Sequence, residues 1–526
     1  MKRDIAALAD RELDLVVVGA GVYGAAVAWD ASLRGLDVAL IDRNDFGSGT
    51  SFNNLKTIHG GIRYLQHLDL KRIRESIRER RILMRIAPHL VHPLPFLVPT
   101  YQGSVTRSRA ALRLALAAND LLSWDRNRGS SEEKRLPPGR ALSSGECLEL
   151  APDIDRAGLT GGVLWHDAQM YNSDRLTLSF VLSAAREGTA VASFVEAEGF
   201  IRKGSRIQGI VAKDVLSGTG GLEIRARMVV NTSGPWVDRL LEKAGGVPRK
   251  PLFRFSKAMN LVTRPVVDKV ALGVMRGGPL LVVSPWRNVS LVGTRHAPYH
   301  GEPDALEATE EDVQSLLDDI NRAYPAARLE RKDVRLIHRG LLPMAGSSSN
   351  GAGVHLLKSY LIDESVEGLL SIVGVKYTTA RDVAEKAVDR ALSRMGKTHV
   401  PSRTATTPLA GGDIESFCDL AASVEPRHLA FNYGTRYREV LALGDLEPVC
   451  ETSPVTRAEI RHAVREEMAL DLASVVLRRT ELGSAGHPGR EALERTAAIV
   501  AEELHWSDEK KRAEVEAVER FYRTRS

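Results

Sequence analysis

Three glycines near the N-terminus have the spacing of a phosphate-binding turn. Gly19, Gly21 and Gly24 follow the apolar run 15–18 and open an alanine-rich segment. The first glycine permits a tight turn, the second lets the backbone approach a pyrophosphate, and the third lets the next helix pack close to the sheet. The N–H groups at the start of that helix favour phosphates. The pattern predicts a dinucleotide site, with a plain strand–helix–strand unit as the alternative.

An acidic residue and two distant junctions indicate which dinucleotide binds. Asp42 ends the second strand of the unit, where a carboxylate can accept hydrogen bonds from ribose hydroxyls. Further strand–turn–helix junctions lie at 226–238 and 369–379. A nucleotide fold assembled from separated pieces suits FAD, because FAD is long and lies across its domain. The predicted FAD-binding residues are Gly19, Gly21, Val22, Tyr23, Gly24, Asp42, Arg43, Thr50, Ser51, His59, Gly60, Val195, Ser233, Gly234, Gly374, Lys376 and Thr378.

Four residues form the predicted catalytic set, and their types suit the oxidation of an anionic alcohol. Such a reaction moves a hydride to flavin N5 while a base takes the hydroxyl proton. Arg63 and Tyr64 offer donors to a phosphate or carboxylate, unless they are a surface arginine and a core tyrosine. His59 is the candidate base, or else a histidine bonded within the flavin loop. Lys376 places a positive charge near flavin N1 or the substrate, or simply begins a helix.

The hydrophobic pattern predicts an α/β protein with three parts. Alternating apolar runs dominate the chain up to about residue 400, and helical periodicity dominates beyond it. Thr456 and Glu459 have the spacing of a capping box, which predicts a helix start. The expected parts are a discontinuous FAD-binding domain over 1–100, 160–245 and 335–400, a substrate or cap domain over 101–159 and 246–334, and a C-terminal helical domain over 401–526.

Motifs along nearly the whole chain resemble those of the flavin-dependent glycerol-3-phosphate dehydrogenases and oxidases. The matching segments are 19–24, 49–65, 87–90, 167–169, 231–238, 374–379 and 459–483, of which 59–65 is the most specific. The resemblance implies a Rossmann-like FAD-binding domain of the glutathione-reductase/D-amino-acid-oxidase type, an antiparallel β substrate domain and a C-terminal α-helical domain. It also implies that Arg63 and Tyr64 bind substrate, and that electrons pass to quinone or oxygen at the inner membrane face.

The chain departs from that family at substrate-site positions. Asn260 stands where family members have histidine, and Leu342 stands where they have arginine. Arg295, His338 or Arg339 could restore the positive charge, and we add Arg339 to Arg63, Tyr64 and Lys376 as a substrate-binding candidate.

The leading prediction is therefore FAD-dependent oxidation of sn-glycerol 3-phosphate, or a closely related polyol phosphate, to the ketone. The first alternative is the same fold acting on a 2-hydroxy acid or an amine. The second alternative is a flavin-binding protein without catalysis.

Composition restricts the other partners. The 526 residues have a formal net charge of +5, which favours small anionic ligands weakly. Nucleic acid is not expected, because zinc-finger and aromatic RNA-binding motifs are missing. The widely separated Cys147, Cys418 and Cys450 offer no metal-site spacing, so no metal is expected.

The expected location is the cytoplasm, either free or attached to the inner membrane face. The N-terminus has no signal-peptide pattern, and no apolar run approaches the roughly 20 residues of a membrane span. A basic helix at 67–86 and a leucine-rich helix at 105–124 could lie on a membrane. The alternatives are a solvated face for the first helix, which we favour, and core packing for the second.

Overall fold

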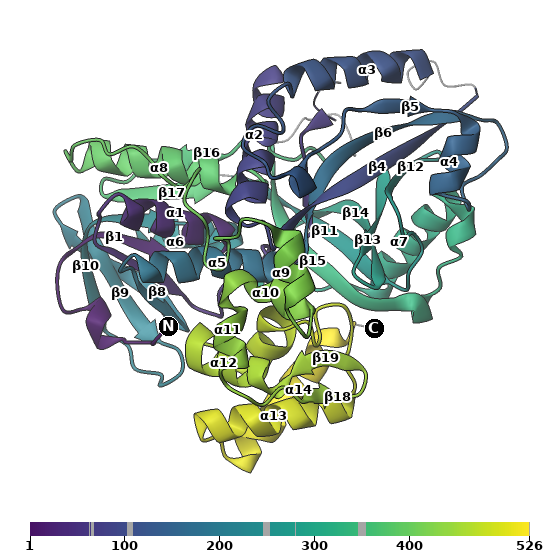
Figure 1. The fold of residues 1–526 in the computed structure, drawn as a ribbon. Helices are drawn as coiled ribbons and strands as arrows, with labels where there is room; N and C mark the ends of the chain where they lie inside the picture. Colours follow the sequence, from purple (N-terminus) through teal and green to yellow (C-terminus); the bar gives the residue numbers. More distant parts are fainter. Residues whose placement is uncertain are drawn as a thin grey trace.

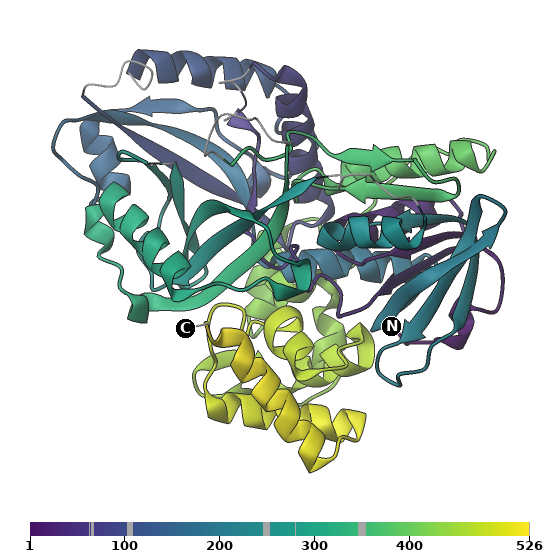
Figure 2. The same ribbon diagram turned by 180° about the vertical axis from the view of Figure 1, so that it is seen from behind.

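The computed structural model shows two β-sheets lying side by side, with a helical C-terminal module packed below their junction (Figure 1). The view from behind shows the same three parts (Figure 2). The structure describes residues 1–62, 64, 68–102, 109–245, 253–278, 280–345 and 354–524.

The first sheet contains the parallel strands that the glycine turn predicts. Its order is β16-β17-β10-β1-β2-β7, with β9 paired to β10 and β8 paired to β9. All six residues of β1 are buried, as expected for a parallel strand covered on both faces. The strands are β1 (Leu13–Val18), β2 (Val38–Asp42), β7 (Ala190–Ser193), β8 (Val195–Lys203), β9 (Arg206–Asp214), β10 (Leu222–Asn231), β16 (Leu361–Asp363) and β17 (Leu369–Val373).

Helices cover this sheet and begin at its strand ends. On one face α1 contacts both α5 and α8, whereas α6 contacts β8 and β17. The bounds are α1 (Val22–Leu33), α5 (Ser173–Arg186), α6 (Val237–Lys243) and α8 (Ala380–Arg394). Because α1, α6 and α8 each follow a strand of the parallel sheet, their N-termini gather near the carboxyl ends of β1, β10 and β17.

The second sheet is mostly antiparallel, and helices α4 and α7 pack against one of its faces. Its order is β15-β11-β14-β13-β12-β4-β6-β3, with β5 paired to β6. The strands are β3 (Thr57–Ile58), β4 (Val91–Tyr101), β5 (Arg140–Leu142), β6 (Leu159–Met170), β11 (Arg254–Thr263), β12 (Ala271–Val274), β13 (Leu281–Trp286), β14 (Val289–Tyr299) and β15 (Val334–Met344). The helices around it are α2 (Leu70–Ile86), α3 (Arg109–Leu122), α4 (Ser144–Leu150) and α7 (Glu310–Ala323).

Several strands of this sheet come from segments that the sequence assigns to the FAD-binding domain. Strand β3 and all but one residue of each of β4, β6 and β15 fall within the ranges expected for that domain. Strand β4 pairs with β6 along its whole length, from Val91 opposite Met170 to Tyr101 opposite Leu159. The alternation of apolar residues shows that a segment is a strand, but it does not show which strand pairs with it.

The C-terminal module contains helices and one short hairpin. The predicted capping box is present, since Thr456 and Glu459 bond each other's backbone at the start of α12. The elements are α9 (Phe417–Ser423), α10 (His428–Tyr433), α11 (Tyr437–Leu441), β18 (Pro448–Cys450), β19 (Ser453–Thr456), α12 (Arg457–Glu467), a π-helical turn (Ser474–Arg479), α13 (Arg490–Leu504) and α14 (Asp508–Tyr522). Within the described residues, every helix is too short or too polar to span a bilayer.

The module shares an apolar core with the second sheet. Leu472 and Val475 of the module lie in one buried cluster with Phe52, Trp286 and Leu291. The C-terminal helices are therefore not an independent unit attached by a linker, but complete the burial of residues from the first 300 positions.

Candidate cofactor and substrate site

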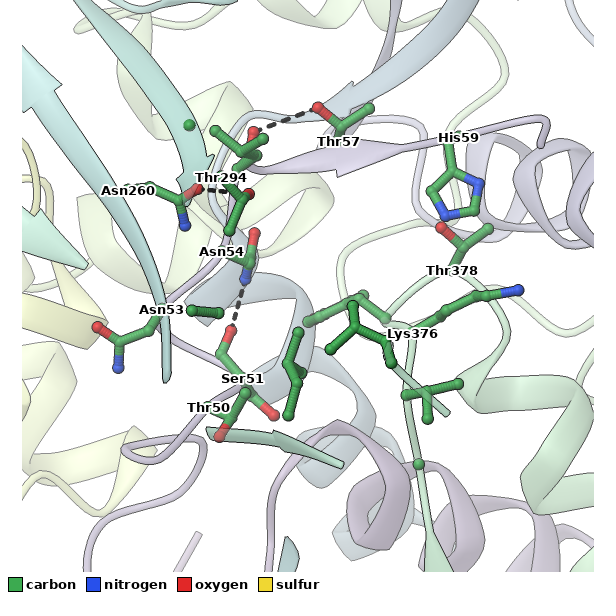
Figure 3. A pocket seen from close by; sticks show the side chains of 18 of the residues that line it. Thr50, Ser51, Asn53, Asn54, Thr57, His59, Asn260, Thr294, Lys376 and Thr378 are labelled. Atoms are coloured by element: carbon green, nitrogen blue, oxygen red, sulfur yellow. Dashed lines mark hydrogen bonds between the residues drawn. The ribbon is translucent and has the colours of Figure 1, made fainter. Parts of the chain in front are cut away.

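A cavity of about 1890 Å³ extends from the glycine turn after β1 to the second sheet. The end of β1, residues within 42–51 and part of α6 line the nucleotide end. Strands β11 and β14 line the opposite wall. Figure 3 shows His59, Lys376 and Thr378 on one side of this space, with Asn260 and Thr294 on the other.

The glycine turn has no room for side chains. Gly19 has a φ of +100°, and a Cβ there would lie 2.7 Å from the carbonyl oxygen of Thr232. A Cβ on Gly24 would lie 1.8 Å from the carbonyl oxygen of Gly19. Helix α1 can therefore begin directly against the ends of β1 and β10, with Gly21 as its N-cap.

The N-terminus of α1 and the Ser51 hydroxyl lie together at the cavity. The N–H of Val22 donates to Oγ of Ser51 at 3.0 Å, and both residues line the cavity. Helix N-termini bind phosphate through such N–H groups. The glycine cradle, the helix start and the serine hydroxyl thus fit the pyrophosphate of a dinucleotide.

Asp42 lies at the end of β2 with its carboxylate held by the backbone. Its oxygens accept hydrogen bonds from the N–H groups of Ala20 at 2.7 Å and Asn44 at 2.9 Å. Burial raises the pKa of Asp42 to about 6, although these two N–H groups and Arg43 oppose the shift. The carboxylate is therefore oriented toward the nucleotide end of the cavity, which it lines.

A charged cluster joins the nucleotide end to the second sheet. Arg43 stacks on the Trp236 ring, with its guanidinium carbon 4.3 Å from the ring centroid, and forms an ion pair with Asp304. Asp304 also pairs with Arg239 at 2.5 Å and accepts from Nε1 of Trp236 at 3.0 Å. Asp304 lies in a 3₁₀ turn after β14 of the second sheet, so this cluster connects that sheet to the nucleotide end of the cavity.

Lys376, Tyr64 and His59 come together at the other end of the cavity. The Lys376 ammonium lies 4.2 Å from the centroid of the Tyr64 ring, and the His59 ring lies 5.9 Å from the same ring, edge-on. The backbone carbonyl of Lys376 accepts a hydrogen bond from the Tyr23 hydroxyl at 2.7 Å. This bond positions the turn before α8 against the start of α1.

The loop that contains His59 is fixed from behind by a buried ion pair. Asp167 of β6 pairs with Arg80 of α2 and accepts from the N–H of Gly60 at 2.5 Å. A Cβ on Gly60 would lie 2.4 Å from the Arg80 guanidinium. The backbone at Gly60 is therefore pressed against the ion pair, and His59 faces the cavity that it lines.

Two family models match this chain. Residues 14–377 match the FAD dependent oxidoreductases, and residues 402–511 match the C-terminal domain of alpha-glycerophosphate oxidase. The glycerol-3-phosphate dehydrogenase of Synechocystis sp. is 32% identical, over 94% of each chain. The chain belongs to the family of FAD-dependent glycerol-3-phosphate dehydrogenases.

Two further relatives cover most of the chain. The glycerol-3-phosphate dehydrogenase of Mycobacterium leprae is 32% identical, over 95% of this chain and 86% of the relative. The structure of the glycerol-3-phosphate dehydrogenase from Bacillus halodurans, complexed with FAD, superposes with a TM-score of 0.76 at 26% identity, covering 98% of this chain and 96% of that one. The predicted α/β fold with a C-terminal helical domain and the predicted FAD cofactor are confirmed.

Most of the residues predicted to bind FAD lie at the cavity of this FAD-dependent chain. Those that line it are Gly19, Gly21, Val22, Tyr23, Asp42, Arg43, Thr50, Ser51, His59, Val195, Ser233, Gly234, Gly374, Lys376 and Thr378. Gly24 and Gly60 lie behind its wall, where their lack of a side chain allows close packing. Tyr64 is also behind the wall, since its ring is buried beneath Lys376 and only 6% exposed.

Of the other substrate-binding candidates, Arg339 points away from the cavity, and Arg63 lies outside the described residues. Arg339 is three residues before Leu342 on β15, and residues three apart on a strand point to opposite faces. Leu342 lines the cavity, whereas the Arg339 guanidinium lies 5.6 Å from the ring of Phe521 in α14.

The other arginine considered at the substrate wall also points away from it. Arg295 pairs with Asp319 of α7 at 2.5 Å, on the far face of the second sheet. His296, its neighbour, lines the cavity, and its Nδ1 lies 3.3 Å from the Ser256 hydroxyl. Asn260 also lines the cavity and accepts a hydrogen bond from the Thr294 hydroxyl at 2.7 Å (Figure 3).

Asp304, Arg239 and His296 were not predicted to lie at the site. Their positions depend on pairing between segments far apart in the chain, and no local motif marks them. The only signal for His296 is its place in the segment 293–296, which departs from the family pattern.

We expect Gly24→Ala to abolish FAD retention, because the added methyl group would meet the Gly19 carbonyl and the Thr232 hydroxyl. The ratio of flavin to protein absorbance after purification measures this. Gly199→Ala is the matched control, since a Cβ there meets nothing within 4 Å. A Gly24→Ala protein with full flavin content would contradict the assigned packing.

We expect Asp42 to make the stability of the cofactor-free protein depend on pH. Because its pKa is raised to about 6 in the folded state, the protonated form favours folding, and this contribution is lost as the pH rises from about 4 to about 6. Urea unfolding across this range should show the wild type losing roughly 1 to 3 kcal/mol relative to Asp42→Asn. Parallel pH profiles would refute the effect.

Proposed function

We propose that this chain oxidises sn-glycerol 3-phosphate, or a closely related polyol phosphate, to the ketone. The observation that supports this most is the grouping of Lys376, Tyr64 and His59 at one end of a cavity whose other end is a dinucleotide cradle. Full-length relatives named for the same reaction support it further.

The chain's own residues would bind the substrate and take its proton. The Lys376 ammonium supplies a positive charge for the phosphate or for the developing negative charge. His59 lies within the same end of the cavity and accepts the hydroxyl proton. FAD, when bound, supplies the acceptor for two electrons. The buried Arg80–Asp167 pair positions His59 by holding the loop behind it.

A second candidate substrate class is favoured by one observation. Leu342 lines the cavity at a position where other members of the family have an arginine, so the wall offers an apolar contact there. An amine or 2-hydroxy acid with less negative charge would need fewer cations there. Because Lys376 supplies a positive charge at the cavity, a phosphate remains our first choice of substrate.

We expect glycerol 3-phosphate to bleach the flavin absorbance under anaerobic conditions, faster than amino acids or 2-hydroxy acids.

Lys376→Met should lower kcat/KM for glycerol 3-phosphate by about 10- to 100-fold, because a charge-assisted contact is lost. Lys269→Met, in an exposed loop, is the control. Leu342→Arg should lower KM for the phosphate. Faster bleaching by an amine, with Lys376→Met unaffected, would favour the second candidate.

We also propose that helix α3 attaches the protein to a membrane and that the electron acceptor is a quinone. Leu114, Leu121 and Trp124 follow helical spacing and are 74%, 75% and 73% exposed. Helix α3 lies on the outer edge of the molecule (Figure 1). Arg113 and Arg128 are exposed on the same segment, which suits an anionic lipid surface.

The cavity opens toward the apolar stripe formed by Leu114, Leu121 and Trp124. Leu68 and Leu114 are both strongly exposed and also line the cavity. A lipid-soluble acceptor could therefore approach from the membrane side, which favours quinone over oxygen. The arginines of α2 are less suited to lipid contact, because Arg74 and Arg81 pair with Asp125.

We expect the double variant Leu121→Ser, Trp124→Ser to bind vesicles containing anionic lipid about tenfold more weakly than the wild type. Co-sedimentation with the vesicles measures this. The double variant Leu216→Ser, Leu446→Ser removes exposed leucines elsewhere and should bind as the wild type does. Equal losses in both would show that the stripe has no special role.

A further inference from the structure

The segment between β2 and β3 wraps the nucleotide end of the cavity. Arg43, Asn44 and the run 47–51 line it. Asp45 lies within this segment but is 1% exposed and faces away from the cavity wall. Its backbone carbonyl accepts from the N–H of Ser48 at 3.2 Å, so its position influences the turn that leads to Ser51.

Two consecutive arginines of the C-terminal module hold Asp45. Arg479 donates to both carboxylate oxygens, at 2.9 and 2.6 Å, and Nε of Arg478 donates at 2.5 Å. Both arginines belong to the π-helical turn Ser474–Arg479 and are almost fully buried. Burial by itself would raise the pKa of Asp45, but Arg479 and Arg478 lower it to about 2. The carboxylate is therefore charged and paired at any working pH.

The same module also contacts the far end of the segment. Phe52 is packed among Leu472 and Val475 of the module, and its ring lies 6.1 Å from that of Phe521. The Phe52 carbonyl accepts a hydrogen bond at 2.8 Å from Lys56, whose amine is fully buried. The module thus contacts the segment at Asp45 and at Phe52, on either side of residues 47–51 that line the cavity.

We propose that the C-terminal module is part of the FAD site, because Arg478 and Arg479 position the segment 43–51 through Asp45. Asp45 is a positioning residue, since it acts on the cofactor through the backbone to which Asn44, Ser48 and Ser51 belong. Docking of the module and binding of FAD are then coupled, and each strengthens the other by the same factor. The inference depends on the chain binding FAD and not on which candidate substrate it oxidises.

The test compares two buried ion pairs of the same module in the full-length chain. Asp45→Asn and Arg479→Gln disturb the pair at the FAD segment. Glu459→Gln disturbs the buried pair between Glu459 and His428, whose atoms lie 2.8 Å apart inside the module and not at Asp45. FAD affinity is measured by fluorescence titration of the cofactor-free protein, and the unfolding midpoint is measured in parallel.

We expect Asp45→Asn and Arg479→Gln to weaken FAD binding by about tenfold or more and to alter the visible spectrum of the bound flavin. Glu459→Gln should lower the unfolding midpoint to a similar extent but leave FAD affinity within about threefold of the wild type. Equal effects of both pairs on FAD affinity, or no effect of either, would overturn the proposal.

Wild-type protein provides a second measurement, in case the variants do not fold. Hydrogen exchange with and without FAD should show added protection at 43–51 and at 474–480, greater than at 490–504 in α13. If FAD protects the segment 43–51 but leaves 474–480 unchanged, the two are not coupled and the proposal is wrong. Neither readout uses substrate turnover, so a different substrate would leave the result intact.

Discussion

The close approach of backbone to backbone at the first glycine turn determines the rest of this structure. Gly24 lies so near Gly19 that one methyl group would separate α1 from β1. This contact places the start of α1 at the carboxyl ends of the parallel strands, where β10 and β17 also end. The nucleotide cradle, the turn before α8 with Lys376, and the segment after β2 all converge on that point because the strands are parallel.

The two ends of the cavity are built by different means. The nucleotide end consists of backbone groups and short side chains, arranged by the strand–turn–helix junctions. The end at which we propose that substrate binds depends on long side chains whose directions are set by packing, such as Lys376 above the Tyr64 ring and His59 in front of the Arg80–Asp167 pair. On this proposal, variation at Asn260 and Leu342, which line the cavity, changes the substrate and leaves the FAD cradle intact.

Local patterns in the sequence were sufficient for part of this arrangement. The first βαβ unit, the junction at Lys376 and the capping box at Thr456 each depend on residues close together in the chain, and they were predicted. The assignment of β4 and β6 to the second sheet depends on pairing that local periodicity does not show. Arg339 was expected at the substrate because of its charge, but the strand's alternation places it on the other face.

The partners of Asp45 stand 433 and 434 positions further along the chain. During synthesis the ribosome completes the glycine turn and the segment after β2 long before it adds Arg478 and Arg479. Domains that fold as they emerge do so from the N-terminus onward. In this protein Asp45 would lack both arginine partners until translation is nearly finished. If the module positions the FAD segment as we propose, the flavin is loaded onto the completed polypeptide and not onto the nascent one.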